Sequence, residues 1–191
     1  MIPFNHLGWL FSRFGSVAYP ESVVRELCGA LREVREGGAV LDLGAGTGIV
    51  GNYAYGCRSD LRYTAADPAE GMLRYVPGHF EKVIARAEAL PFDDAVFDAV
   101  VAGEAVHHFD ATDDALREAA RVLRSGGLLF VYEFDPSTLL GRLLCIAEKL
   151  LGEPGHFYPP GVLVGKLEAH GFRAAVSRHG WRYTLTARLE R

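Results

Sequence analysis

Short apolar runs alternate along the chain with longer segments whose apolar residues recur at helical spacing. Runs that are apolar at nearly every position indicate strands buried on both faces. Alternation of such strands with helices is typical of a mostly parallel sheet covered by helices. The strands are expected at 39–43, 61–66, 82–85, 97–101 and 127–133.

The segments between these runs are predicted helices. One is expected to begin at Pro20 and to continue to Gly37 and Gly38, with apolar residues at three- and four-residue intervals. The clearest begins at Thr112, which is expected to cap it, and has basic residues up to Arg124 near its negative end. The other helices are expected after Gly48 and at 69–75, 137–151 and 161–169.

The end of the chain alternates polar and apolar positions over 172–187, with Gly180 near the middle. This pattern predicts an antiparallel hairpin, which brings the total to about seven strands. No repeat or long linker divides the sequence. We therefore expect residues 1–191 to form a single α/β domain, a doubly wound, seven-stranded, mostly parallel sheet with an antiparallel C-terminal hairpin.

Composition narrows the classes of protein. The chain has 191 residues, of which 49% are hydrophobic and 23% charged, and a net charge of −4. It is long enough to bury a core, and its acidic balance argues against a protein that coats nucleic acid. Its apolar runs of about five residues are too short to span a membrane. Without a secretory signal pattern, a cytoplasmic location is expected.

Two residue types add to this picture. The chain has 17 arginines, 3 lysines and no glutamine, which is typical of a thermophile, although a GC-rich genome would give the same arginine bias. Its three cysteines, Cys28, Cys57 and Cys145, are widely spaced, with no CxxC pair. We expect inert thiols rather than a redox or metal site.

A glycine-rich turn, 44–48, follows the first predicted strand. Gly44 and Gly46 allow the backbone to approach a ligand closely. The dinucleotide fingerprint GxGxxG needs a glycine where this chain has Ile49. A pyrophosphate binds at a helix N-terminus without an adjacent carboxylate. In this chain a carboxylate, that of Asp42, stands two residues before the first glycine. Asp42 therefore favours a cationic, amino-acid-like ligand over a phosphate.

Asp67 ends the second predicted strand, 23 residues after Gly44. A carboxylate at this place can accept hydrogen bonds from both hydroxyls of a ribose. S-adenosylmethionine has these properties, because it contains a ribose, carries a positive charge and has no phosphate.

With these motifs in order, residues 36–135 resemble the class I S-adenosylmethionine-dependent methyltransferases, in particular the small-molecule branch that includes quinone-biosynthesis methyltransferases. The motifs are LDLGAGTG (41–48), DPAEGML (67–73), AEALPF (87–92), FDAVV (97–101), VHHF (106–109) and EAARVLRSGG (118–127). The resemblance implies a Rossmann-like methyltransferase fold and transfer of a methyl group to a small molecule by in-line displacement.

The resemblance also implies a set of cofactor contacts. Glycines of the first motif would lie against the methionine part, Asp67 on the ribose and Met72 beside the adenine. The family often has an acid where this chain has Arg86, so adenine is expected to be held by the Ala87 backbone and apolar packing. The implied contacts are Asp42, Gly44, Ala45, Gly46, Asp67, Pro68, Met72, Ala87, Glu88 and Ala102.

The catalytic candidates are His107 and Tyr19. His107 and His108 follow the fourth strand, at the end of the sheet where ligands bind. Alignment of the nucleophile can alone contribute about 7–11 kcal/mol, so a general base is optional; Glu104 and Glu133 are further candidates for it. A metal site is not expected at the histidines, because the sequence offers no third ligand near them.

The two ends of the chain are candidates for lids over the cofactor. The segments 1–19 and 134–160 are rich in aromatic residues, although simple amphipathic packing would give the same pattern. A single basic residue, Arg13, weakens the alternative that the first segment docks on a membrane. Few residues remain outside the cofactor motifs, which favours a small-molecule acceptor.

Two other functions stay open. A protein of this fold can bind the cofactor without turnover, as a regulator or assembly partner, and a nicotinamide-dependent oxidoreductase is the further alternative. The sequence does not indicate the attacked atom or the oligomeric state.

Overall fold

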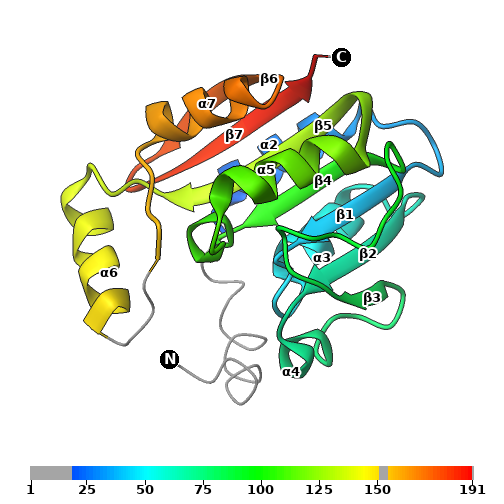
Figure 1. Cartoon of the computed structure of the whole chain (residues 1–191), viewed down its shortest axis with the longest axis horizontal. Coiled ribbons are helices and arrows are strands. Elements are labelled where there is room, and N and C mark those ends of the chain that lie inside the picture. The colour runs from blue at the N-terminus through cyan, green and yellow to red at the C-terminus, as the bar shows by residue number, and fades with distance from the viewer. Residues whose placement is uncertain (1–18, 151–154, 191) are drawn as a thin grey trace.

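A single sheet of seven strands organises the computed structural model, which describes residues 19–150 and 155–190 (Figure 1). The strand order is β3-β2-β1-β4-β5-β7-β6. The strands are β1 (Ala39–Leu43), β2 (Arg62–Asp67), β3 (Glu81–Ile84), β4 (Phe97–Gly103), β5 (Leu123–Phe134), β6 (Phe172–His179) and β7 (Arg182–Leu189). The first five run parallel, and β7 pairs antiparallel with both β5 and β6. The predicted fold class is confirmed.

Helices cover both faces of this sheet. The helical elements of the described residues are α2 (Glu21–Leu31), α3 (Ile49–Cys57), α4 (Glu70–Leu73), η2 (Val106–His108, a 3-10 turn), α5 (Thr112–Val122), α6 (Leu139–Leu150) and α7 (Pro160–Ala169). Of these, α6 stands apart from the sheet (Figure 1). In Figure 1, α5 and α7 lie on the near face and α2 lies behind the strands.

The alternation of side chains along each strand divides the core into two layers. In β1, Leu41 packs in the layer beneath α5 and α7, together with residues such as Leu116 and Leu163. Its neighbour Val40 belongs to the layer beneath α2 and α3, with Leu27. Because both faces are covered, β1 is buried at every position, which explains its continuous apolar run.

Three expected helix boundaries were wrong. The helix from Pro20 ends at Leu31, before the glycines. Thr112 does not cap α5 but is its first residue, and its hydroxyl oxygen lies 3.1 Å from that of Tyr158. Arg124 belongs to β5, because Leu123 directly after α5 already pairs with Phe97 of β4.

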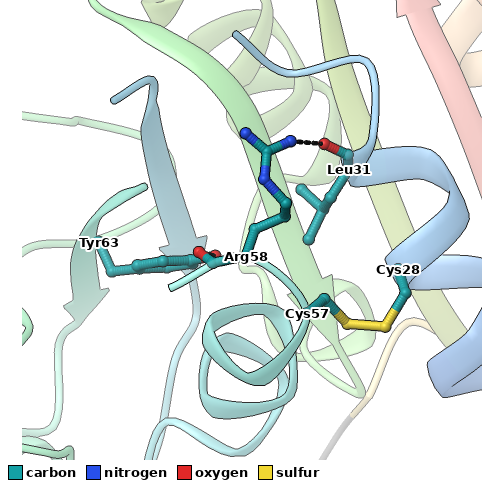
Figure 2. Close-up of a disulfide and its surroundings, with 5 residues drawn as sticks. All are labelled: Cys28, Leu31, Cys57, Arg58 and Tyr63. Carbon is teal, nitrogen blue, oxygen red and sulfur yellow. Dashed lines mark hydrogen bonds between the residues drawn. A yellow bond between two sulfur atoms is a disulfide. The ribbon is translucent and has the colours of Figure 1, made fainter. Parts of the chain in front are cut away.

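Cys28 of α2 and Cys57 at the end of α3 form a disulfide (Figure 2). The prediction of inert thiols was therefore wrong for this pair, whereas Cys145 is buried and is not part of a disulfide. Packing of the two helices brings the Cα atoms to 5.1 Å, within the range for a disulfide. Next to it, Arg58 donates hydrogen bonds to the carbonyl of Leu31 at 2.8 Å and that of Val34 at 2.9 Å.

The candidate lids are described only in part. Residues 1–18 and 151–154 lie outside the described residues, which leaves Tyr19 of the first lid and mainly α6 of the second. Leu139, Leu143 and Leu150 of α6 are exposed. Among the described residues, no helix is long and apolar enough to cross a membrane.

Candidate active site

The glycine-rich loop after β1 is held against the end of β2. Gly44, Gly46 and Gly48 have φ of +67°, +54° and +80°, a region that glycine adopts at little cost. The Gly44 amide donates to the Ala66 carbonyl at 2.9 Å. The Asp67 carboxylate accepts the Gly46 amide at 2.8 Å, so the sequence motifs that begin at 41 and 67 are joined directly.

A cavity of about 740 Å³ opens at this end of the sheet, within the usual range for a small-molecule site. The structure brings together in its wall ten of the predicted residues. They are Tyr19, Gly44, Ala45, Gly46, Asp67, Pro68, Met72, Ala87, Glu88 and His107.

Ala102, an implied cofactor contact, does not line the cavity. Its side chain is 1% exposed and packs in the core layer beneath α5 and α7. Gly103 and Glu104 form the wall instead. Alternation along β4 turns the Ala102 side chain into the core, and a cofactor contact of Ala102 stays a prediction.

Asp42 is fully buried and lies outside the cavity wall. Its Oδ2 accepts the Gly51 amide at 3.1 Å, and its Oδ1 has no hydrogen-bond partner among the described residues. Burial raises the pKa of this carboxyl to about 7. A buried carboxyl with an unused oxygen lowers its free energy when a cation or donor comes near, which fits a cationic ligand at the loop.

Asp67 forms part of the wall itself. Its Oδ1 accepts the Ala69 amide at 2.7 Å, in addition to the Gly46 bond from the loop. Burial raises its pKa, and these two amide hydrogen bonds oppose that shift. The two bonds fix the carboxylate at the end of β2, where a ribose can be bound.

At the other end of the cavity, Glu88 accepts the Ala111 amide at 3.2 Å. The Nε atom of Arg86 lies 3.7 Å from Glu88, and the same guanidinium pairs with Asp110. All three charged residues line the cavity. The arginine at the family's acidic position is thus flanked by two carboxylates, which offset its charge.

His107 and Glu133 form a buried pair, with His107 Nδ1 2.6 Å from Glu133 Oε2. The other carboxylate oxygen, Oε1, accepts the Val106 amide at 2.8 Å. Burial favours a higher pKa for Glu133, but its interactions with His107 outweigh this and keep the pKa below its ordinary value. An ionised Glu133 accepts a hydrogen bond from the Nδ1–H group of His107. The proton of the neutral ring then stays on Nδ1, and Nε2 is the basic nitrogen.

Aromatic rings surround this pair. The His107 ring stacks on Phe157 with centroids 4.8 Å apart and lies 4.0 Å from the His108 ring. Burial and the neighbouring His107 lower the pKa of His108 to about 4, so His108 is neutral near pH 7. The sequence had no local signal for the contact of Phe157 with His107, which are 50 positions apart.

Tyr19 packs in the cavity wall with its ring centroid 4.8 Å from that of Tyr132. A Cβ atom at Gly103 would collide with its hydroxyl, so glycine is required there. Burial and the nearby Glu104 carboxylate raise the pKa of Tyr19 well above its ordinary value. Tyr19 therefore stays protonated at neutral pH and acts as a hydrogen-bond donor.

A sheet of this order, with a glycine loop after β1 and a carboxylate after β2, agrees with the methyltransferase fold that the sequence resemblance implies. Residues 41–131 match the model of the methyltransferase domain family. These residues therefore form a methyltransferase domain, and the similarity to S-adenosylmethionine-dependent methyltransferases implies S-adenosylmethionine as its cofactor.

The chain is similar to the ubiquinone/menaquinone biosynthesis C-methyltransferase UbiE of Escherichia coli. The two are 38% identical over 112 residues, which cover 53% of this chain and 45% of that protein. The match thus spans less than half the length of this relative.

Solved methyltransferases share the fold. An O-methyltransferase family protein of Burkholderia thailandensis superposes with a TM-score of 0.81 at 16% identity, covering 98% of this chain and 59% of that one. An S-adenosylmethionine-dependent methyltransferase of Aquifex aeolicus gives 0.69 at 19% identity, over 89% of each chain.

Proposed function

We propose that the protein transfers the methyl group of S-adenosylmethionine to a small molecule with an apolar or aromatic body. The observation that carries this proposal is a cavity lined by the glycine loop, Asp67 and His107, whose ring is paired with the buried Glu133. The name of the similar UbiE protein, a C-methyltransferase of quinone biosynthesis, favours an aromatic acceptor.

The chain's residues fit the parts of the cofactor. The Gly44–Gly46 backbone would lie along the methionine part, with the buried Asp42 carboxyl behind it as the counter-charge for its ammonium group. Asp67 would accept the ribose hydroxyls. When bound, the cofactor would supply an electrophilic methyl group on a sulfonium, whose neutral thioether is the leaving group, so that the protein must mainly align the nucleophile.

His107 is the proposed general base for an acceptor that loses a proton. Glu133 holds its Nδ1 proton and orients the ring, and Nε2 is then the atom that takes the acceptor's proton. Tyr19, with its raised pKa, would donate a hydrogen bond rather than accept a proton. The walls of Phe134 and Phe157, with the two candidate lids, would exclude water during transfer.

The decisive experiment is calorimetric titration of the full chain with S-adenosylmethionine and, separately, with NAD. We expect binding of S-adenosylmethionine only. Loss of a charge-assisted hydrogen bond costs about 1.5 kcal/mol or more, so Asp67→Ala should weaken binding at least 10-fold. The control is Asp114→Ala, because Asp114 pairs with Arg117 on the surface of α5.

Absence of S-adenosylmethionine binding, or an unchanged affinity in Asp67→Ala, would refute the site. Binding without formation of S-adenosylhomocysteine across a broad acceptor panel would favour the regulator or assembly partner over the enzyme.

A cytoplasmic location and heat adaptation also remain predictions. Disulfides are rare in cytosolic proteins of mesophiles but occur in those of hyperthermophiles. The Cys28–Cys57 disulfide therefore fits a cytoplasmic location only in a heat-adapted protein, and the absence of glutamine supports heat adaptation. A Tm below about 65 °C, the upper range for mesophile domains, would argue against heat adaptation.

A further inference from the structure

A carboxylate in the wall of the cavity, that of Glu104, forms an ion pair with an arginine outside the wall, Arg182. Arg182 at the start of β7 places Nη2 3.0 Å from Oε1 of Glu104, which follows β4. The two side chains are 12% and 23% exposed. Glu104 lines the cavity together with Phe134 and Tyr19, so this carboxylate faces the space that the acceptor would occupy.

Aromatic rings fix the position of Arg182. Its guanidinium carbon lies 3.8 Å from the ring centroid of Trp181 and 5.3 Å from that of Phe134. Nη1 donates to the Tyr132 hydroxyl at 3.0 Å. The planar guanidinium thus lies against aromatic rings and contacts two oxygen atoms, the Tyr132 hydroxyl and Glu104 Oε1. Held in this way, the guanidinium is a rigid support for the Glu104 carboxylate.

The backbone at Glu104 is unusual as well. Its φ is +52°, a left-handed conformation that costs free energy for any residue except glycine. Its amide donates to the Tyr132 carbonyl at 2.7 Å, which holds the turn in place. Strained residues of this kind gather at functional sites, and a partly buried ion pair is often no more stabilising than apolar side chains. Stability therefore does not account for a glutamate at this position.

We infer that Glu104 binds a hydroxyl or amine group of the acceptor and that Arg182 is its positioning residue. A carboxylate accepts several hydrogen bonds, so the ion pair with Arg182 does not exhaust it. The flanking Phe134 ring packs against an apolar body. The site thus selects an aromatic acceptor that carries an O–H or N–H group and rejects the same ring without a donor. This inference rests on the proposed function.

The test compares hydroquinone with its dimethyl ether, 1,4-dimethoxybenzene, which has the same ring and oxygen atoms but no hydrogen-bond donor. Their affinities for the full chain are measured calorimetrically in the presence of saturating S-adenosylhomocysteine. We expect hydroquinone to bind at least 10-fold more tightly. Glu104→Gly removes the carboxylate and suits the left-handed backbone; it should reduce the preference to less than 3-fold and leave the affinity for S-adenosylhomocysteine within 2-fold.

Arg182 is tested separately. Arg182→Met should lose most of the preference for hydroquinone, and Arg182→Lys should recover only part of it, because an ammonium cannot hold both oxygens as the planar fork does. The control is Arg188→Lys, at the other end of β7, where the arginine pairs with Glu33. It should behave as the unaltered protein.

Three outcomes would overturn the inference. They are equal binding or no binding of the two probes by the unaltered protein, a preference that survives Glu104→Gly, and a loss of S-adenosylhomocysteine affinity as large as the loss for hydroquinone. The last would assign Glu104 to the cofactor. Failure of S-adenosylhomocysteine itself to bind would instead refute the proposed function.

Discussion

Removing the Cys28–Cys57 disulfide should lower the free energy of unfolding by several kcal/mol. The bond joins residues 29 positions apart, and the loop-closure entropy of the denatured chain then gives about 3.6 kcal/mol at 25 °C. In a domain of this size, each kcal/mol changes the Tm by about 2–4 °C. The expected decrease in Tm is therefore about 7–14 °C.

The assay is guanidinium chloride denaturation of the unaltered protein, with and without a dithiol reductant, and of the double variant Cys28→Ala, Cys57→Ala. The variant should remain folded, because Arg58 still binds the Leu31 and Val34 carbonyls at the end of α2. Since the effect acts on the denatured chain, the dependence of the free energy on denaturant should also be steeper without the crosslink.

Cys145→Ala is the matched control, because it leaves the disulfide in place. Its response to reductant should equal that of the unaltered protein, and the double variant should show none. A loss of less than about 1 kcal/mol in the double variant would refute the loop-closure reasoning.

Burial raises the pKa of Asp42 from 3.8 to about 7. Between these two pKa values the folded protein keeps a proton on Asp42 that the unfolded chain releases. The free energy of unfolding should therefore fall by up to about 4 kcal/mol as the pH rises from about 4 to 7. Denaturation of Asp42→Asn across this range should lack that decline, and parallel profiles would contradict the assignment. In Gly44→Ala, the new Cβ atom would lie 2.8 Å from the Cβ atom of Ala105, at a backbone φ of +67°. We expect the free energy of unfolding to fall by about 1–2 kcal/mol and cofactor binding, measured by titration, to weaken. Gly78→Ala is the control and should change neither, because the space around Gly78 is open. With an acceptor that gives turnover, Glu133→Gln should slow methyl transfer about 100-fold or more and leave cofactor affinity unchanged; unaltered kinetics would remove His107 from the mechanism.

The structure connects parts of the site that the sequence could identify only one by one. The glycine loop and Asp67 each follow a strand, so the position of each is a local property of the chain. Their direct hydrogen bond of 2.8 Å follows once β1 and β2 pair in parallel, because the carboxyl ends of parallel neighbours meet at one edge. This is why the sequence could predict that the loop and Asp67 lie side by side.

The acceptor half depends on contacts between distant positions. His107 meets Glu133 across β4 and β5, and Glu104 meets Arg182 across 78 positions. No spacing rule links such residues, since the approach is set by strand order and by the hairpin of β6 and β7. The same reason explains why the disulfide was missed.

The sequence by itself determined the α/β sheet, the cofactor loop and the two acids near it, because apolar period, glycine spacing and strand ends are encoded locally. Only the tertiary structure decided which side chains face the cavity and which are buried behind it. Ala102 and Asp42 show the difference: each belongs to a cofactor motif or strand, yet packing of the sheet turns Ala102 into the core and places Asp42 beneath the loop. Partners for buried groups are chosen by long-range packing, and that information is spread over the whole chain.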